Sequence, residues 1–383
     1  MLAVLAVAVV AFVSGLVDRA IDIVNPPDAE PAVVEALGDR QPAVLLLTYD
    51  DGDPSGRASG AIVLAHDRDS GQGTVLLVPS TTVADVPGHG SFQLGEAYAL
   101  GGGPLVGVTL DNLLGIRLDG ITTVSVQGWA VLLDRAGGFE IDVRSRLVAA
   151  TDAGGGEVRF EAGPQFLDGP RLAEYLTFRQ EAETELERLP RAQQVVAGLL
   201  DAIERDPEAL NRIFSDGAPM LGTTDPDLVR IVLDELAVAR TEDRLTTLTL
   251  PVSALGSGRD DVYRIDTGRV EQLVAERFAP SIPSEGAGVG RGVQILNGNG
   301  IPRIGQQVAE RLSEGGYRIV LTGNADRFTY ETTRILIYDG SDEQLAVARD
   351  VQARLGVGEI ERAGTPQSVV DVTIVVGADF PPG

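Results

Sequence analysis

The segment Val293–Val320, VQILNGNGIPRIGQQVAERLSEGGYRIV, constrains the fold more than any other part of the chain. It opens with an apolar run typical of a buried strand, and a turn rich in asparagine and glycine follows. Ile304, Val308 and Leu312 then recur at the spacing of one helix face, and a second strand-like run closes the segment. The pattern predicts a strand–helix–strand unit.

The rest of the C-terminal region has the same character. We expect a strand over Thr333–Tyr338, a helix over Asp342–Leu355 and a last strand over Asp371–Phe380. The second helix, like the first, carries its apolar residues on a single face. Two one-sided helices and at least three apolar strands predict a small α/β sandwich over residues 292–383.

Residues 41–280 alternate strand-like and helix-like runs. Short apolar runs bounded by glycine and aspartate predict strands at Ala43–Thr48, Gly60–His66 and Gly73–Val78. Strands separated by helices predict an α/β domain with a covered central sheet. The expected helices lie within Val126–Gly138, from Pro170 onward, at Arg191–Arg205, and at Pro226–Ala239 with Asp225 as N-cap.

The first residues, Met1–Val17, carry no charge and one glycine. As a helix they would be roughly 26 Å long, close to the ~30 Å hydrocarbon core of a bilayer. A buried core helix and a cleaved signal peptide are the alternatives, but signal peptides begin with basic residues and none precede this run. We expect a transmembrane anchor, a juxtamembrane linker over residues 18–40, and the bulk of the chain outside the cytoplasm. A Pro/Gly/Ser-rich stretch, Ser281–Arg291, predicts a linker between the two domains.

Composition excludes several classes of site. The chain has no cysteine and no lysine, only two histidines, and 31 basic residues that are all arginine. This excludes thiolate and multi-histidine metal centres, the lysine of a phosphate-binding P-loop, and Schiff-base chemistry. The net charge of −25 repels nucleic acid, so we expect no nucleic-acid partner.

An acidic loop follows the first expected strand, within Thr48–Leu64, TYDDGDPSGRASGAIVL. Its first half has the spacing of a calcium-binding EF-hand loop, but Ile62 stands where that loop needs a glutamate. A carboxylate at a strand end beside an arginine can hold Mg²⁺ and a phosphate together, while a polar turn explains the same residues. Both interpretations remain open at this stage.

The motifs and their order resemble the LytR–CpsA–Psr family of cell-envelope proteins, followed by a LytR-type C-terminal domain. Asp50 matches the aspartate that ends the family's first strand, and Arg57 matches the arginine after it. Arg179 matches one of two later arginines, and Arg188 and Arg191 fall in a run of an acid, two arginines and glutamines. Other family positions (aspartate, arginine, aspartate, lysine and arginine) are occupied here by Ser59, Ser80, Thr81, Gln93 and Thr177.

The resemblance implies a transferase that moves a glycopolymer from a polyprenyl-pyrophosphate carrier in the membrane onto peptidoglycan. Arginines would clamp the pyrophosphate and acids would hold Mg²⁺. The retained positions form a candidate clamp, with Asp50 as the candidate metal ligand. The clamp residues are Asp50, Arg57, Arg179, Arg188 and Arg191.

Three functions remain open from the sequence. The chain could bind a polyprenyl-phosphate or glycan ligand with weak or no turnover, act as a transferase with a rebuilt site, or serve as a non-catalytic interaction scaffold. Losing one preorganised electrostatic group costs ~10²–10³ in rate, and several are substituted here. We therefore favour ligand binding with little turnover.

Overall fold

The computed structural model describes residues 41–53, 55–87, 89–150, 155–217, 221–223, 225–256, 261–282, 291–313, 315–338, 340–363 and 370–381. The expected anchor, the expected linker 18–40 and residues 283–290 of the second linker lie outside these ranges. Within them, no helix combines the length and the apolar character that crossing a membrane would require.

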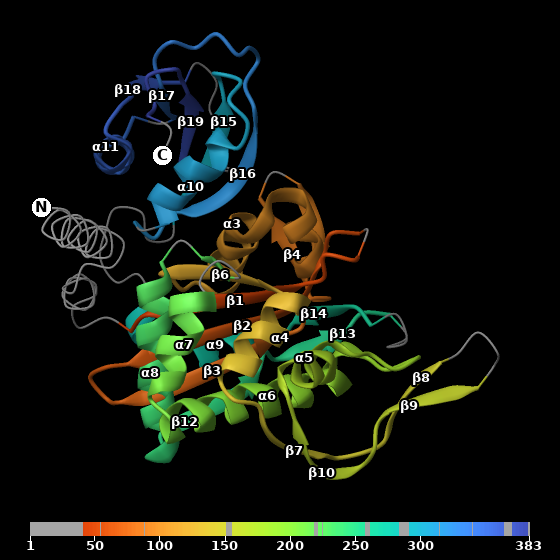
Figure 1. Ribbon diagram of the computed structural model, residues 1–383. Helices are drawn as coiled ribbons and strands as arrows, with labels where there is room; N and C mark the ends of the chain where they lie inside the picture. The colour runs from red at the N-terminus through yellow and green to blue at the C-terminus, as the bar shows by residue number, and fades with distance from the viewer. Residues whose placement is uncertain are drawn as a thin grey trace, which may run out of the picture. The chain divides into compact units, whose positions relative to one another are not determined.

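A six-stranded sheet forms the centre of the larger domain (Figure 1). The middle strands β1, β2 and β3 pair antiparallel, β6 runs parallel to β1, and β12 runs parallel to β3. The three strands predicted from the sequence are confirmed and lie side by side. In spatial order the strands are β11 (Leu221–Thr223), β6 (Gly120–Ser125), β1 (Ala43–Tyr49), β2 (Ala58–Asp67), β3 (Gln72–Val78) and β12 (Leu245–Thr249).

Helices cover both faces of this sheet. Leu45 and Leu47 of β1 share one core with α3 (Leu94–Leu114) and α9 (Thr267–Arg277). The intervening side chains of β1 are also buried, where α6 (Glu185–Arg205) and α8 (Pro226–Thr241) contact the sheet. The covered central sheet is therefore confirmed. The remaining helices of this domain are α4 (Val126–Arg135), α5 (Gly169–Thr177), α7 (Glu208–Gly217) and the 3-10 turn η2 (Ala279–Ser281).

Four two-stranded units surround the central sheet (Figure 1). Two of them matter for the site, because they contact the loop between α5 and α6. Val148 of β8 donates to Gln180 of that loop, and Asp261, just before β14, pairs with Arg179. The pairs are β4–β5 (Val83–Val86, Gly90–Gln93), β7–β10 (Phe139–Val143, Gly163–Leu167), β8–β9 (Leu147–Ala150, Gly156–Phe160) and β13–β14 (Val252–Ala254, Tyr263–Ile265).

Two helix boundaries bear on the predictions. Asp225 accepts a hydrogen bond from the Leu228 N–H at 3.0 Å and caps α8, as expected. The prediction that α6 starts at Arg191 is wrong, since a capping box between Thr184 and Glu187 starts it at Glu185. Pro190 lies inside this helix. Proline removes one backbone donor and ordinarily marks a helix start, so the sequence pattern placed the start after it.

The C-terminal domain is a five-stranded sheet with two helices. Ile304, Val308 and Leu312 of α10 (Ile304–Ser313) are fully buried in its core, together with the apolar face of α11 (Asp342–Leu355). This confirms the predicted small α/β sandwich, although its last strand ends at Val376 rather than Phe380. The strands in order are β16 (Arg318–Asn324), β15 (Gly292–Asn297), β19 (Val372–Val376), β17 (Arg334–Ile337) and β18 (Glu359–Arg362).

The chain after α9 stays with the larger domain at the start of the expected linker. Ser281 is buried, and its hydroxyl donates to the backbone and side-chain oxygens of Gln41 at 3.1 and 2.9 Å. Independent folding of the two domains remains a prediction.

Candidate functional site: a buried arginine–carboxylate network

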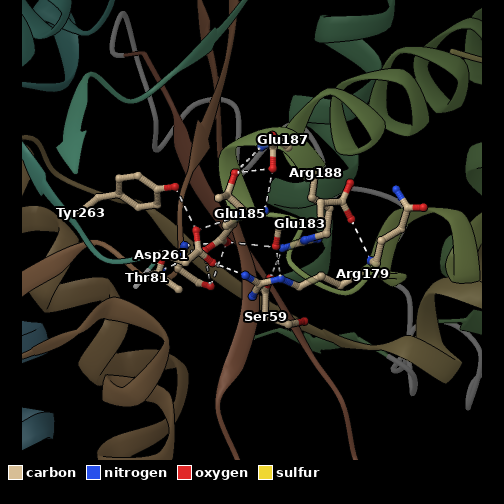
Figure 2. Close-up of polar contacts among 12 residues, drawn as sticks. Ser59, Thr81, Arg179, Glu183, Glu185, Glu187, Arg188, Asp261 and Tyr263 are labelled. Carbon is tan, nitrogen blue, oxygen red and sulfur yellow. Dashed lines mark hydrogen bonds and ion pairs between the residues drawn. The ribbon is translucent and has the colours of Figure 1, made fainter. Parts of the chain in front are cut away.

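Arg188 lies in the first turns of α6 with its side chain almost fully buried. Its guanidinium donates to the backbone oxygens of Leu176 and Ser59 and lies 3.4 Å from a carboxylate oxygen of Glu185 (Figure 2). Burial lowers the pKa of Arg188, and the Glu185 carboxylate opposes that shift. Arg188 thus links α6 to the end of α5 and to β2. Both of its terminal nitrogens donate hydrogen bonds within the protein.

Glu185 is the most buried charged group of the network, with 1% of its surface exposed. Its carboxylate accepts hydrogen bonds from the backbone N–H of Ser80 at 2.8 Å and of Thr81 at 3.0 Å, and from both hydroxyls. Such bonds satisfy the acceptor oxygens of a buried carboxylate. The acid thus has neutral donors from Ser80 and Thr81 beside the guanidinium of Arg188.

Arg191 is one helical turn beyond Arg188 and pairs with Glu183 through two nitrogens, at 2.6 and 2.9 Å. Both side chains are largely buried, and Arg191 also donates to the backbone oxygens of Tyr175 and Phe178. Although burial opposes it, hydrogen bonds from Arg191 and from the Gln180 N–H hold the pKa of Glu183 below its ordinary value. This two-point pair fixes the loop between α5 and α6.

Arg179 lies in that loop and is about half exposed, with 46% of its side chain accessible. It forms an ion pair with Asp261 and donates through Nε to the backbone oxygen of Glu183 at 2.7 Å. Asp261 in turn accepts from the Glu185 N–H and the Tyr263 hydroxyl, both at 2.9 Å (Figure 2). Strand β14 and its preceding loop therefore supply the counter-ion of a candidate clamp arginine.

The structure brings Arg179, Arg188 and Arg191 together, but it gives Asp50 and Arg57 other partners. Arg57 pairs with Glu96 of α3 at 2.9 Å, and Asp50 accepts from the Gly52 N–H at 2.9 Å in an exposed turn. Within the described residues, no hydrogen bond or ion pair joins these two side chains to the network. A polar turn, one of the two interpretations left open by the sequence, is enough to explain the contacts of Asp50 in this structure.

A preformed magnesium site does not fit the residues present. Across the described ranges, no group of three or more histidine or acidic side chains is placed to hold a metal ion. Ser59, near the end of the same loop, brings no carboxylate, and its hydroxyl donates to the Thr48 backbone oxygen at 3.4 Å. Mg²⁺ at Asp50 therefore remains a prediction for a ligand-bound state, where phosphate oxygens would complete its shell.

An open pocket of about 610 Å³ lies beside the network. It is bounded by the β8–β9 hairpin and by residues from the end of α5 to the third turn of α6. Its wall is of mixed polar and apolar character, and Tyr175 donates to Gln194 at 2.7 Å within it. The polar lining includes Arg144, Gln180, Glu183, Glu187, Arg191 and Gln194.

Sequence reasoning missed most of the acids that hold these arginines. Glu183 could have been suspected, because it lies eight residues before Arg191 in the same run of acids and arginines. Asp261 gave no signal, since it is separated from Arg179 by 82 positions and follows an unremarkable Gly/Ser/Arg loop. Because the chain has arginine but no lysine, the sequence indicated which residues supply positive charge. It did not indicate which acids pair with them.

The comparisons with known proteins agree with this fold. The chain is similar to the polyisoprenyl-teichoic acid–peptidoglycan teichoic acid transferase TagU of Enterococcus faecalis, with 29% identity over 174 residues, 44% of this chain and 55% of the relative. It is similarly 29% identical to the regulatory protein MsrR of Staphylococcus aureus over 143 residues, 37% of this chain and 43% of the relative. The matched part thus spans about half the length of these curated relatives.

Among solved structures, the fold is similar to that of Bacillus subtilis TagV. The TM-score is 0.52 at 19% identity, and the match covers 62% of this chain and 97% of TagV. Residues 292–380 match the family model described as LytR cell envelope-related transcriptional attenuator. Residues 24–278, which are well over half of the chain, match the LytR_cpsA_psr model, and the protein is therefore a member of the LytR–CpsA–Psr family.

Proposed function

We propose that this protein is a membrane-anchored envelope protein that binds a glycopolymer, or its polyprenyl-phosphate carrier, outside the cytoplasm and transfers it weakly or not at all. The observation that carries the proposal is the internal pairing of the candidate clamp. Each retained arginine already has a carboxylate partner: Arg57 with Glu96, Arg179 with Asp261, Arg188 with Glu185, and Arg191 with Glu183.

Such pairing acts against transfer of a pyrophosphate-linked group. A transferase stabilises the charge of the leaving phosphate with donors that are preorganised and available in the transition state. Here a phosphate would have to displace a buried carboxylate, and breaking a buried ion pair leaves an uncompensated charge. Serine and threonine at positions 80 and 81 add hydrogen-bond donors but no positive charge.

Binding of the sugar units of a glycopolymer is compatible with the same groups. The pocket beside the network offers amide, hydroxyl and guanidinium groups at its wall, which suit sugar hydroxyls. Its charged lining consists of both signs, and Arg191 and Glu183 neutralise each other. The name of the Enterococcus relative, a teichoic acid transferase, supports a cell-wall glycopolymer as the ligand class.

Mass spectrometry of lipids and glycans that co-purify with the full chain tests the proposal. We expect a polyprenyl-linked or glycan species that is retained through size-exclusion chromatography and lost on organic extraction. A Gln194→Ala/Arg144→Ala variant should lose it, whereas Arg146→Ala, on the neighbouring exposed Glu161 pair, should retain it. A preparation with no such species, and no uptake of a polyprenyl-linked glycan added in detergent, would leave only the scaffold function.

A further inference from the structure

The three clustered arginines of the network differ in how well solvent can reach them. Arg188 and Arg191 expose 8% and 7% of their side chains, while Arg179 exposes 46%. An anion arriving from solvent can therefore contact Arg179 without unfolding the site, whereas Arg188 and Arg191 offer it little exposed surface. Arg179 is the point at which an external anion and an internal carboxylate compete.

The carboxylate at that point is Asp261, and three elements hold it there. One oxygen forms the ion pair with Arg179, and the other accepts from the Glu185 N–H and the Tyr263 hydroxyl, both at 2.9 Å. Its backbone has φ of 50°, in the left-handed region, which aspartate and asparagine adopt more readily than other residues with a side chain. The hydrogen bonds from Glu185 and Tyr263 fix one carboxylate oxygen, so that the other faces the arginine.

Charge within the network balances. Arg179, Arg188 and Arg191 supply three positive charges, and Glu183, Glu185 and Asp261 supply three negative charges. Glu187 caps α6 through Thr184 and adds further negative charge nearby. Removing the charge of Asp261 alone would leave the half-exposed guanidinium of Arg179 without the carboxylate it pairs with.

Resting on the proposed function, we infer that Asp261 is a specificity-determining residue: its carboxylate occupies the Arg179 guanidinium in place of a ligand phosphate. It weakens the contact of a phosphate or pyrophosphate group with Arg179 and leaves the sugar units of the ligand to be bound in the neighbouring polar pocket. The guanidinium fork of Arg179 is otherwise suited to a phosphate, which it would bind through two parallel N–H donors.

Calorimetric titration of the full-length protein with inorganic pyrophosphate tests this inference. We expect Asp261→Asn to bind pyrophosphate at least about tenfold more tightly than the unaltered protein, because it removes a unit charge at contact distance from the arginine. The gain should disappear in the double variant Asp261→Asn/Arg179→Gln. Asp201→Asn is the matched control, since it frees Arg240, another partly exposed arginine, from its pair between α6 and α8 and makes the same change in net charge.

A second variant guards against loss of folding in Asp261→Asn. Tyr263→Phe keeps the carboxylate but removes one hydrogen bond that positions it, so a smaller gain of a few fold is expected. Folded variants without any gain would overturn the inference. An equal gain in Asp201→Asn would overturn it as well, because net charge alone would then account for the effect. Neither result depends on whether the protein transfers glycopolymer.

Discussion

The carboxylate of Glu185 accepts hydrogen bonds from both the backbone N–H and the hydroxyl of Ser80, at 2.8 and 2.9 Å. Both donors of Ser80 thus face an internal acid. The same acid lies against Arg188. The polar groups of Ser80 therefore serve the folded state, and they present no positive charge to a ligand.

Arg188 should contribute strongly to stability. Replacing it with Gln leaves the buried Glu185 carboxylate without its counter-ion, and losing one partner of a buried pair costs about 3–5 kcal/mol. Arg57→Gln, in an exposed pair with Glu96, should cost at most about 1 kcal/mol. Urea denaturation of the two variants measures both. Equal, small losses would show that Arg188 is solvated in solution.

The Glu183–Arg191 pair should make stability depend on acid pH. The folded pKa of Glu183 lies below its ordinary value, so its contribution is fully present above about pH 4.3, the unfolded pKa, and is lost as pH falls through the folded pKa. The difference in unfolding free energy between the unaltered protein and Glu183→Gln should therefore shrink below that pH. A difference that stays constant down to pH 3 would rule out this pair as its source.

Two glycines of α3 should differ in what a methyl group costs. Gly102 has φ of 70° and ψ of −163°, a conformation nearly restricted to glycine, and it kinks the helix before Pro104. Gly115, the C-cap, has φ of 68° in the ordinary left-handed helical region. A Cβ meets no severe clash at either site, so Gly102→Ala should cost more, about 1–3 kcal/mol. Thermal denaturation compares them, and equal costs would contradict the backbone argument.

The proposed topology places the C-terminal domain outside the cytoplasm, anchored by Met1–Val17. Protease added to intact spheroplasts should therefore degrade residues 292–383, while a cytoplasmic marker stays intact. Protection of that domain until detergent is added would contradict the topology. Replacing two apolar residues of the anchor, Leu5 and Val9, with arginine should release the chain from the membrane fraction, since charge at a helix centre opposes insertion.

Local patterns in the sequence accounted for much of the fold. The alternation of apolar runs and turn residues located β1, β2 and β3, and the Asp225–Pro226 pair marked the start of α8 because both are helix-start signals. Helix α3 was missed, since Gly101, Gly102 and Gly103 precede Pro104 within it and such residues ordinarily end helices. Burial against the central sheet offsets that local cost.

The site was predicted less completely than the fold. The arginines of α6 and its preceding loop do converge, but the acids that neutralise them depend on long-range contacts. Trp129 illustrates the difference: a large apolar side chain in an amphipathic segment is ordinarily buried, whereas its 2.9 Å hydrogen bond to the Thr48 hydroxyl depends on a strand 81 positions away. Pairing between distant segments, such as Asp261 with Arg179, depends on tertiary geometry that spacing along the chain does not encode.

The most direct test of the account is a transfer assay with the full-length protein. A labelled glycopolymer on polyprenyl pyrophosphate is mixed with peptidoglycan and Mg²⁺, and both bound and transferred label are counted, with an active relative such as the Enterococcus faecalis transferase as reference. The account predicts label bound to the protein and at least about a hundredfold less transfer than the reference, in line with the loss of preorganised charge. Transfer at a rate comparable to the reference would contradict it.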